Sequence, residues 1–141
     1  MTPPVLASIH AAAFTDPRPW SAAEFTTLLA GPGVFLGAEG RGFVVGRVIL
    51  DEAEVLTIAV SPEAQGQGLG QRLMAEFAAK AVARGAVRGY LEVAAHNAAA
   101  RAVYARAGWA ECGRRKGYYH LADGTPTDAV LMACTFAQPT G

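Results

Sequence analysis

Apolar residues recur at helical spacing near the start of the chain. Val5, Ile9 and Ala13 lie four residues apart within residues 5–14, and this spacing predicts a short helix with one apolar side. Asp16-Pro17-Arg18-Pro19 follows and ends the helix, because proline lacks the backbone donor that a helix interior needs.

A second helix is predicted directly afterwards. Ser21 has the side chain of an N-cap, and Glu24, three residues later, completes a capping box. The apolar side of this helix consists of Phe25, Leu28 and Leu29. The glycine–proline–glycine sequence at residues 31–33 ends it.

Three runs of β-favouring residues come next and predict strands at residues 34–38, 42–50 and 54–60. Short connections at residues 39–41 and 51–53 join them as hairpins. Strands joined in this way run antiparallel.

A longer helix follows a glycine-rich stretch. Leu69, Leu73, Phe77 and Ala81 recur every four residues, which predicts a helix with one apolar side. Gly85 is its expected end, because glycine readily adopts the left-handed conformation that closes a helix.

Strand and helix then alternate to the end of the chain. The pattern predicts a strand at residues 87–94, a helix at 98–107 between the cap Asn97 and Gly108, and a strand at 129–135. The fold class is therefore α/β (α+β), with a mixed, mostly antiparallel sheet flanked by helices. The helix before the strand at 87–94 implies one parallel pair of strands.

Composition fits one domain over residues 1–141. Hydrophobic residues make up 52% of the chain and charged residues 17%, which is ample material for a core. The 12 basic and 12 acidic residues cancel, whereas proteins that bind nucleic acid normally carry a basic excess. We therefore expect no nucleic-acid partner.

The cysteines and histidines predict no metal site. Cys112 and Cys134 lie outside any CxxC spacing and are expected to be reduced thiols, and His10, His96 and His120 are scattered. No apolar run approaches the ~18 residues of a membrane span, and no signal-peptide pattern is present. These features predict a cytoplasmic protein with no membrane partner.

The glycine-rich stretch is Gln65-Gly66-Gln67-Gly68-Leu69-Gly70. Glycine permits positive φ angles, so that successive backbone N–H groups can face one anion, and a helix N-terminus adds further donors. A pyrophosphate suits such a cradle, and from glycine content alone an ordinary strand-to-helix turn is the alternative. The P-loop pattern GxxxxGK[ST] and the dinucleotide fingerprint GxGxxG both fit worse.

This stretch resembles the Q/RxxGxG/A motif of the GCN-five-related N-acetyltransferase (GNAT) superfamily. As in that family, it lies between a strand, Val55–Val60, and a helix. The resemblance continues through Tyr90–Val93, Asn97–Ala100, Tyr104 and Gly108-Trp109, and covers nearly the whole chain. It implies the GNAT fold, with the parallel strand pair splayed around an acetyl-CoA site, and acetyl transfer without a metal.

Within the superfamily, the chain is most similar to the bacterial RimI-like enzymes, which acetylate the N-terminal alanine of a small-subunit ribosomal protein. The features that point to them are Pro19-Trp20-Ser21 with Phe25, Ile58-Ala59-Val60, Asn97–Ala100, and Arg114-Arg115 followed by Tyr118-Tyr119. The resemblance thus implies a protein or peptide N-terminus as the acceptor, with a ribosomal protein suggested by likeness only.

The resemblance also assigns roles to residues. The implied acetyl-CoA-binding positions are Ile58, Ala59, Val60, Gly66, Gln67, Gly68, Leu69, Gly70, Gln71 and Asn97. Glu92 is implied as general base and Tyr104 as general acid, and a backbone N–H of residues 58–60 would polarise the acetyl carbonyl. Relatives often carry arginine or lysine at position 66, so Gly66 makes cofactor binding lean on Arg72 or another nearby base.

The residue pattern around Glu92 partly supports its role as general base. Strand alternation puts it on the face opposite Leu91 and Val93, and a carboxylate among apolar neighbours on a central strand suits proton transfer. The alternative is a carboxylate paired with Arg88 or with a helix arginine. Glu54 on the neighbouring strand is the reserve base.

Tyr104 follows Asn97 by seven residues, so the two lie near one helix face, about 10 Å apart along the axis. One elongated cofactor can therefore contact both. A phenol of pKa ~10 that protonates a thiolate of pKa ~8.5 works against about 2 kcal/mol. The alternatives are a half-buried core tyrosine and, for Asn97, a plain N-cap.

The acceptor class follows from amine basicity. At pH ~7.5, deprotonation costs about 4 kcal/mol for a lysine and well under ~1 kcal/mol for a peptide α-amine. A weakly placed base acting through water therefore suffices for an N-terminus. The alternatives are an acetyltransferase for lysine or a small-molecule amine, and a non-catalytic acyl-CoA-binding module, which would need neither Glu92 nor Tyr104.

Aromatic and basic residues supply candidates for the wall of a peptide groove. These are Arg114, Arg115, Tyr118 and Tyr119, for which a plain hairpin is the alternative. Trp20 and Phe25 are assigned either to the core or to the groove.

Overall fold

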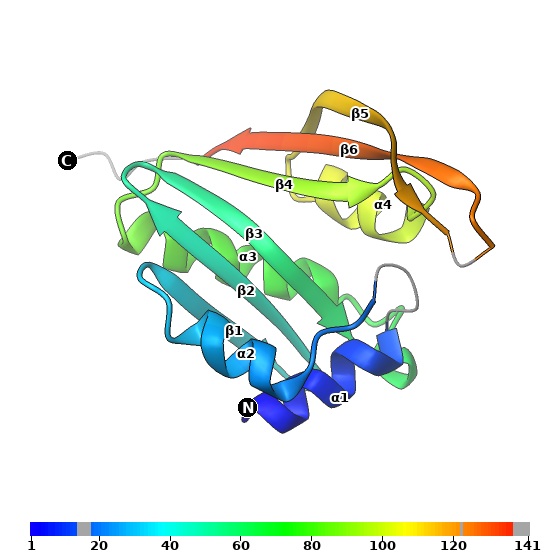
Figure 1. The fold of residues 1–141 in the computed structure, drawn as a ribbon. Coiled ribbons are helices and arrows are strands. Elements are labelled where there is room, and N and C mark those ends of the chain that lie inside the picture. The colour runs from blue at the N-terminus through cyan, green and yellow to red at the C-terminus, as the bar shows by residue number, and fades with distance from the viewer. Residues whose placement is uncertain (14–17, 122, 137–141) are drawn as a thin grey trace.

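A computed structural model describes residues 1–13, 18–121 and 123–136. The chain forms a sheet with helices on both faces (Figure 1). In chain order the elements are α1 (Pro3–Ala13), α2 (Ala22–Leu29), β1 (Val34–Glu39), β2 (Gly42–Ile49), β3 (Glu52–Val60), the 3-10 turn η1 (Pro62–Ala64), α3 (Leu69–Ala83), β4 (Arg88–Ala94), α4 (Ala98–Arg106), β5 (Ala110–His120) and β6 (Pro126–Thr135).

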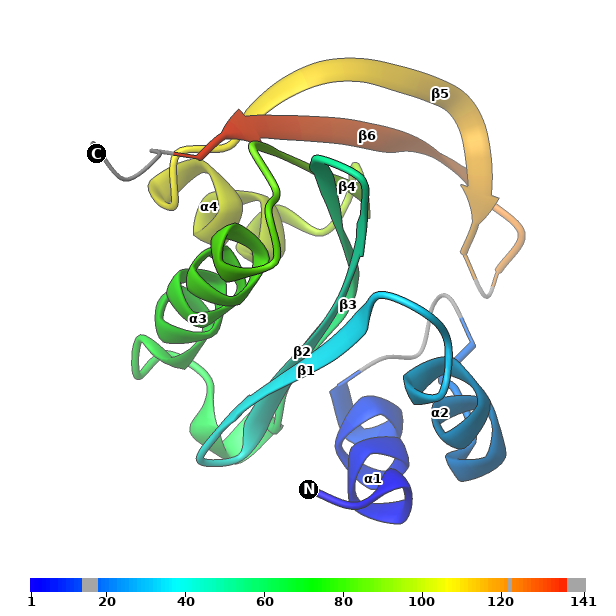
Figure 2. The same cartoon turned by 90° about the vertical axis from the view of Figure 1, so that its left-hand side faces the viewer.

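The six-stranded sheet has the order β1-β2-β3-β4-β6-β5. Neighbouring strands are antiparallel except β3 and β4, which are parallel. Helices α3 and α4 cover one side, and α1 and α2 cover the other side of β1 to β3 (Figure 2). The predicted mixed, mostly antiparallel α/β class and the predicted parallel pair are confirmed.

Local sequence signals explain the predicted helices. The Ser21 hydroxyl accepts from the backbone N–H of Glu24 while the Glu24 carboxylate accepts from that of Ser21, so the predicted capping box is present. The Asn97 side chain caps α4 by accepting from the backbone N–H of Ala100, without the reciprocal bond of a capping box. Gly85 and Gly108 have φ angles of 92° and 96° beyond the ends of α3 and α4, as the stop signals predict.

Helix α1 differs from the prediction at its start and in its apolar face. It begins at Pro3, because proline suits the first turn, where its missing N–H has no partner to lose. Leu6 and His10 form its buried side, whereas Val5 is exposed. The predicted end of the helix, Phe14 and Asp16-Pro17, lies outside the described residues.

The core between the sheet and α3 depends on a close approach at Gly46. Phe35 and Phe77 stack with ring centroids 5.5 Å apart above this position. A Cβ on Gly46 would lie 2.5 Å from Phe35 and 2.6 Å from Phe77, so only glycine lets the helix approach this closely. The same core contains Tyr104 and Trp109 and therefore fixes α4 as well.

The hairpin between β2 and β3 is tighter than predicted. Strand β3 begins at Glu52, so Glu52 and Ala53 belong to the strand and the turn is formed by Leu50 and Asp51. Leu50 has a φ of 58° and is 90% exposed. Residues other than glycine rarely adopt a left-handed conformation, so Leu50 was assigned to the strand and a longer turn was predicted.

Strand β5 was not predicted. It spans Ala110–His120 at the edge of the sheet and pairs only with β6. Its residues are mostly exposed, four of them are charged, and the register shifts twice along it. Edge strands are commonly charged and bulged, and those features remove the alternation by which a strand is identified.

A second core on the opposite face holds α1 and α2 through an aromatic cluster. Phe25 and Phe43 pack at right angles, and His10 stacks on Trp20 with centroids 5.2 Å apart. His10 is 4% exposed and lies 3.0 Å from the Thr57 hydroxyl of β3. Burial lowers the pKa of His10 to about 4, against a smaller opposing effect of the Glu24 carboxylate.

We predict that the free energy of unfolding falls as the pH drops from 6.5 to about 4. The unfolded His10 binds a proton below its ordinary pKa of 6.5, whereas the folded one does not until about 4, so acid favours the unfolded chain. The loss from this residue is about 3 kcal/mol. Urea unfolding of the protein at pH 7, 5.5 and 4.5 measures it.

The matched variants for this test are His10→Gln and His120→Gln. His120 is exposed, so its replacement should leave the pH dependence unchanged. His10→Gln should flatten the dependence whatever its effect on stability at pH 7. An equally steep decline in both variants would show that His10 is not the responsible group.

Candidate functional site

The site begins where β3 and β4 separate. The two strands pair only over Glu52–Glu54 and Arg88–Tyr90, and beyond these residues they diverge (Figure 1). Residues 55–60 keep β2 as their partner on the outer side, and residues 91–94 keep β6. Within the described ranges, the facing edges thus have no strand partner, which leaves backbone groups open to a ligand.

A β-bulge shapes the open edge of β3. Thr57 pairs with Val45 and Val55 pairs with Gly46, so that Leu56 is the extra residue. Val55 and Ile58 pack on the side of α3, whereas Leu56 packs with the cluster of α1 and α2. Thr57 contacts His10 of α1, so Leu56 and Thr57 project to the same face. Strict alternation would have placed them on opposite faces.

A cavity of about 640 Å³ occupies the gap between the strands and is lined from both faces of the sheet. On the α3/α4 face its walls include the glycine stretch, Asn97 and Tyr104. On the α1/α2 face they include His10, Trp20, Thr57, Glu92 and Tyr119. Cavities of this size accommodate extended small molecules.

The predicted site residues converge on this cavity. Its walls contain Ile58, Ala59, Val60, Gly66, Gly68, Leu69, Gly70, Gln71, Glu92, Asn97 and Tyr104. Gln67 is the exception, because its side chain is exposed and does not line the cavity. Residues from the two strands, the loop and two helices are therefore brought together as expected, and their roles remain predictions.

The glycine loop has the geometry of an anion cradle. Gly66 and Gly68 have φ angles of 79° and 77°, and a Cβ added at either would meet nothing within 4 Å. Glycine is thus required there by backbone conformation and not by packing. Gly68 is the N-cap of α3 and provides no side-chain cap, so the first-turn N–H groups of α3 remain available to a ligand.

Gly70 and Gln71 hold α3 against α4. A Cβ on Gly70 would lie 3.3 Å from Val103, and the Gln71 side-chain amide donates to the Val103 carbonyl at 3.0 Å. The Gln71 side chain therefore joins two helices. This contact between α3 and α4 places Tyr104 and Arg106 of α4 at the wall of the cavity.

The expected cation Arg72 is engaged elsewhere. Its Nε lies 2.8 Å from the Glu39 carboxylate, and its side chain does not line the cavity. Arg106, at the end of α4, lines the cavity and has no ion pair within the described part of the chain. No periodic signal in the sequence pointed to Arg106, because residues two apart on a helix project to different sides.

Tyr104 is 6% exposed and borders the cavity. Among residues 1–13, 18–121 and 123–136, no hydrogen-bond partner is found for its hydroxyl, which leaves that group for a ligand. Burial raises the pKa of Tyr104, so the phenol keeps its proton throughout the physiological range.

Glu92 has polar neighbours, contrary to the apolar surroundings expected from the sequence. The Tyr119 hydroxyl donates to Oε1 at 2.8 Å, and Arg115 Nε lies 3.7 Å from Oε2. Burial and, next, the bond to Glu92 raise the pKa of Tyr119, so it remains a donor. The alternative partner Arg88 instead lies 3.3 Å from Asp51.

The reserve base Glu54 is excluded from the cavity. It pairs with Arg47 at 3.1 Å and is not among the cavity's lining residues. Glu54 belongs to the short stretch where β3 still pairs with β4, before the gap opens.

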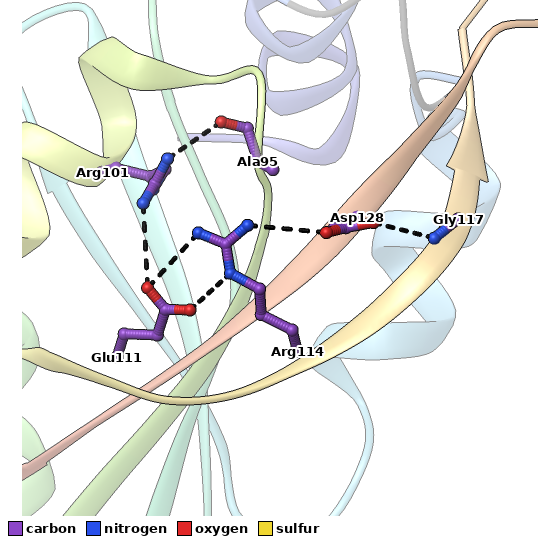
Figure 3. Close-up of polar contacts among 6 residues, drawn as sticks. All are labelled: Ala95, Arg101, Glu111, Arg114, Gly117 and Asp128. Carbon is purple, nitrogen blue, oxygen red and sulfur yellow. Dashed lines mark hydrogen bonds and ion pairs between the residues drawn. The ribbon is translucent and has the colours of Figure 1, made fainter.

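A polar network fixes the strand that carries Tyr119 (Figure 3). Asp128 of β6 accepts from the backbone N–H of Gly117 at 2.9 Å and from Arg114 at 3.5 Å. Gly117 lies in the register shift between Arg115 and Tyr119. Arg101 links Glu111 to the Ala95 carbonyl at the end of β4. This network therefore holds the bulge from which Tyr119 reaches Glu92.

The groove candidates divide between the cavity and other environments. Tyr119 and Trp20 line the cavity, whereas Phe25 is fully buried in the core. Tyr118 is 52% exposed and lies beneath Arg115, with the guanidinium 5.0 Å from its ring centroid. His10, Thr57 and His96 also line the cavity. Thr57 and His96 had no periodic signal because they lie beside a β-bulge and in a turn. His10 was missed because the predicted apolar side of its helix was Val5, Ile9 and Ala13, whereas Leu6 and His10 are the buried residues.

The described residues contain neither a metal-ligating cluster nor a membrane-spanning helix. No group of three or more His, Cys, Asp or Glu side chains in that part of the chain could hold a metal ion. None of the described helices has the length and apolar character to cross a membrane.

Comparisons with known proteins, by sequence and by structure, agree on one family. The sequence model described as "Acetyltransferase (GNAT) family" matches residues 6–109. The "[Ribosomal protein bS18]-alanine N-acetyltransferase" of Escherichia coli (strain K12) is 43% identical over 91 residues. That alignment covers 64% of this chain, and this chain spans only 61% of the relative's length.

Two further relatives cover more of the chain. The "N-alpha-acetyltransferase RimI" of Mycobacterium tuberculosis is 38% identical over 143 residues, covering 95% of this chain and 87% of that protein. The crystal structure of the Escherichia coli ribosomal-protein-S18-alanine N-acetyltransferase superposes with a TM-score of 0.84 at 34% identity. This superposition covers 99% of this chain and 90% of that one.

Proposed function

Because the chain belongs to the acetyltransferase (GNAT) family, we propose that it transfers acetyl from acetyl-CoA to a protein N-terminal α-amine. We propose further that the acceptor begins with alanine, belongs to a ribosomal protein and is modified in the cytoplasm. The names of the relatives from Escherichia coli and Mycobacterium tuberculosis support this acceptor class.

The observation that carries the proposal is a cavity that passes through the sheet with different chemistry at each face. The α3/α4 face offers the backbone cradle of Gly66 and Gly68 and the side chain of Tyr104, whose hydroxyl has no hydrogen-bond partner among the described residues. The α1/α2 face offers the carboxylate of Glu92. A donor thioester and an acceptor amine can thus approach the gap from opposite faces.

The cradle and the strand edge would hold the donor. Backbone N–H groups of the loop and of the first turn of α3 would bind the pyrophosphate, and Asn97 would lie along the pantetheine arm. An open N–H of Ile58–Val60 would bind the acetyl oxygen as it becomes negative.

Proton transfer would use both faces. Glu92, held by Tyr119, would take the proton that the amine nitrogen loses as its bond to the acetyl carbon forms. As the carbon–sulfur bond breaks, the Tyr104 hydroxyl would give its proton to the sulfur. The buried surroundings that make this phenol hold its proton also make the sulfur more basic, which reduces the mismatch between them. Exchange with solvent restores both side chains.

The function is tested with acetyl-CoA and a panel of peptides. Peptides that begin with free Ala, Ser or Met should be acetylated at the α-amine, with Ala preferred. An acetyl-Ala peptide with an internal lysine should not react, because its ε-amine is charged at neutral pH. Mass spectrometry locates the product. Reaction of the blocked peptide but not of the free N-termini would contradict the proposal.

Replacing Tyr104 by phenylalanine tests the proposed acid. Tyr104→Phe keeps the ring packed in the core and removes only the hydroxyl, so acetyl-CoA should still bind. Turnover should fall by about 10²-fold, the typical contribution of a positioned proton donor. Calorimetric binding and steady-state kcat separate the two effects, and an unchanged kcat would remove Tyr104 from the mechanism.

Arg106→Gln tests which cation serves the cradle, with Arg72→Gln as the matched control. Loss of this exposed charge near the phosphates should raise the KM for acetyl-CoA about 3- to 5-fold, and added salt should reduce the difference. Arg72→Gln should leave KM unchanged, because its partner is Glu39. The reverse result would return the role to Arg72.

A further inference from the structure

His10 has one possible arrangement of hydrogens. The backbone N–H of Trp20 donates to Nδ1 at 3.0 Å, so in the neutral ring the hydrogen must be on Nε2. Nε2 lies 3.0 Å from the Thr57 hydroxyl oxygen. The ring therefore donates and the hydroxyl accepts. Burial keeps the ring neutral above about pH 4, so this direction persists at physiological pH.

The Thr57 hydroxyl then has its own hydrogen left to donate. Within the described part of the chain, His10 is its only hydrogen-bond partner. Because one lone pair faces the imidazole, the hydrogen is directed away from the ring, and the side chain borders the cavity. The bulge at Leu56 is what brings this side chain to the cavity's α1/α2 face.

Thr57 of β3 and Glu92 of β4 line opposite walls of the cavity on the α1/α2 face of the sheet. Leu91 and Val93 pack in the core on the α3/α4 side, so Glu92 between them projects the other way, as Thr57 does. Both side chains line one cavity. A molecule whose amine approaches Glu92 would thus meet a hydroxyl donor on the facing strand.

The acceptor classes differ in what surrounds their nitrogen. An N-terminal α-amine has a backbone carbonyl one carbon away, whereas the ε-amine of lysine has only methylene groups nearby. A donor opposite the base can bind that carbonyl and has nothing to bind in lysine. Failure to satisfy a buried donor is unfavourable, so such a group discriminates against the wrong amine.

We propose that Thr57 is a specificity-determining residue whose hydroxyl, oriented by His10, donates to the first backbone carbonyl of the acceptor. The proposal rests on the proposed function and refines it, since it names the group that distinguishes an α-amine from a lysine. It adds a substrate contact to the site and leaves the proton transfers of Glu92 and Tyr104 unchanged.

The test compares two acceptors and two variants. The acceptors are an alanine-first peptide and its analogue with a trans-alkene in place of the first peptide bond, which keeps the shape and the amine but lacks the carbonyl. The variants are Thr57→Val, which is nearly the same size without a hydroxyl, and Thr57→Ser, which retains one. Because removal of the carbonyl raises the pKa of the amine, kcat/KM for each acceptor is expressed per neutral amine, so that the comparison reports the carbonyl contact alone. The second readout is KM for acetyl-CoA.

The wild-type protein should prefer the peptide to the alkene analogue by about 3- to 10-fold, the effect of one neutral hydrogen bond. Thr57→Val should abolish this preference by lowering kcat/KM for the peptide alone, whereas Thr57→Ser should keep it. The KM for acetyl-CoA should not change in either variant.

Two outcomes would overturn the role of Thr57. One is a preference that survives in Thr57→Val, and the other is an equal loss with both acceptors, which would indicate a structural defect. Both require an active wild-type enzyme. A wild-type protein that acetylates no peptide would instead contradict the proposed function, and the role of Thr57 with it.

Discussion

The site depends on one constraint, the separation of two parallel strands after three paired residues. Strand β3 is held by β2 and strand β4 by β6, so each can leave the other without losing its place in the sheet. The gap exposes backbone groups that would otherwise pair, and it joins the two faces of the sheet. The glycine loop, α4 and the aromatic cluster around His10 are arranged about this opening.

The helices on the two faces maintain different chemistry at the ends of the cavity. On one face, the contact of Gly70 and Gln71 with Val103 brings the end of α4 to the glycine cradle, and Tyr104 remains protonated through burial. On the other face, the Glu92 carboxylate accepts a hydrogen bond from the Tyr119 hydroxyl. The register shift at Gly117, fixed by Asp128, places that tyrosine. The two faces of the sheet thus position their polar groups independently.

Much of the fold could be predicted because short-range signals decided it. The capping box at Ser21, the cap Asn97 and the glycine after each long helix are local features, and helical spacing identified the buried side of α3. The glycine motif identified the cavity's α3/α4 wall for the same reason. Strand β5 lacked such a signal, since its charged, bulged residues face solvent at the sheet edge.

The polar contacts of the other wall could not be predicted. Thr57 faces the cavity because of a bulge that depends on the pairing of β3 with β2, and Glu92 meets Tyr119 because of a bulge in β5. Arg72 was a reasonable cation by proximity to the loop, but Glu39 on β1 binds it. In each case the decisive partner is distant in sequence.

The most direct test of a passage through the sheet is a crystal structure with a bisubstrate ligand, in which an acetyl bridge joins CoA to the α-amine of an alanine-first peptide. We expect the pyrophosphate at Gly66–Gly70, the bridge between β3 and β4, and the peptide on the face of Glu92 and Thr57. A peptide on the α3/α4 face, or a bridge that does not pass between the two strands, would contradict this account.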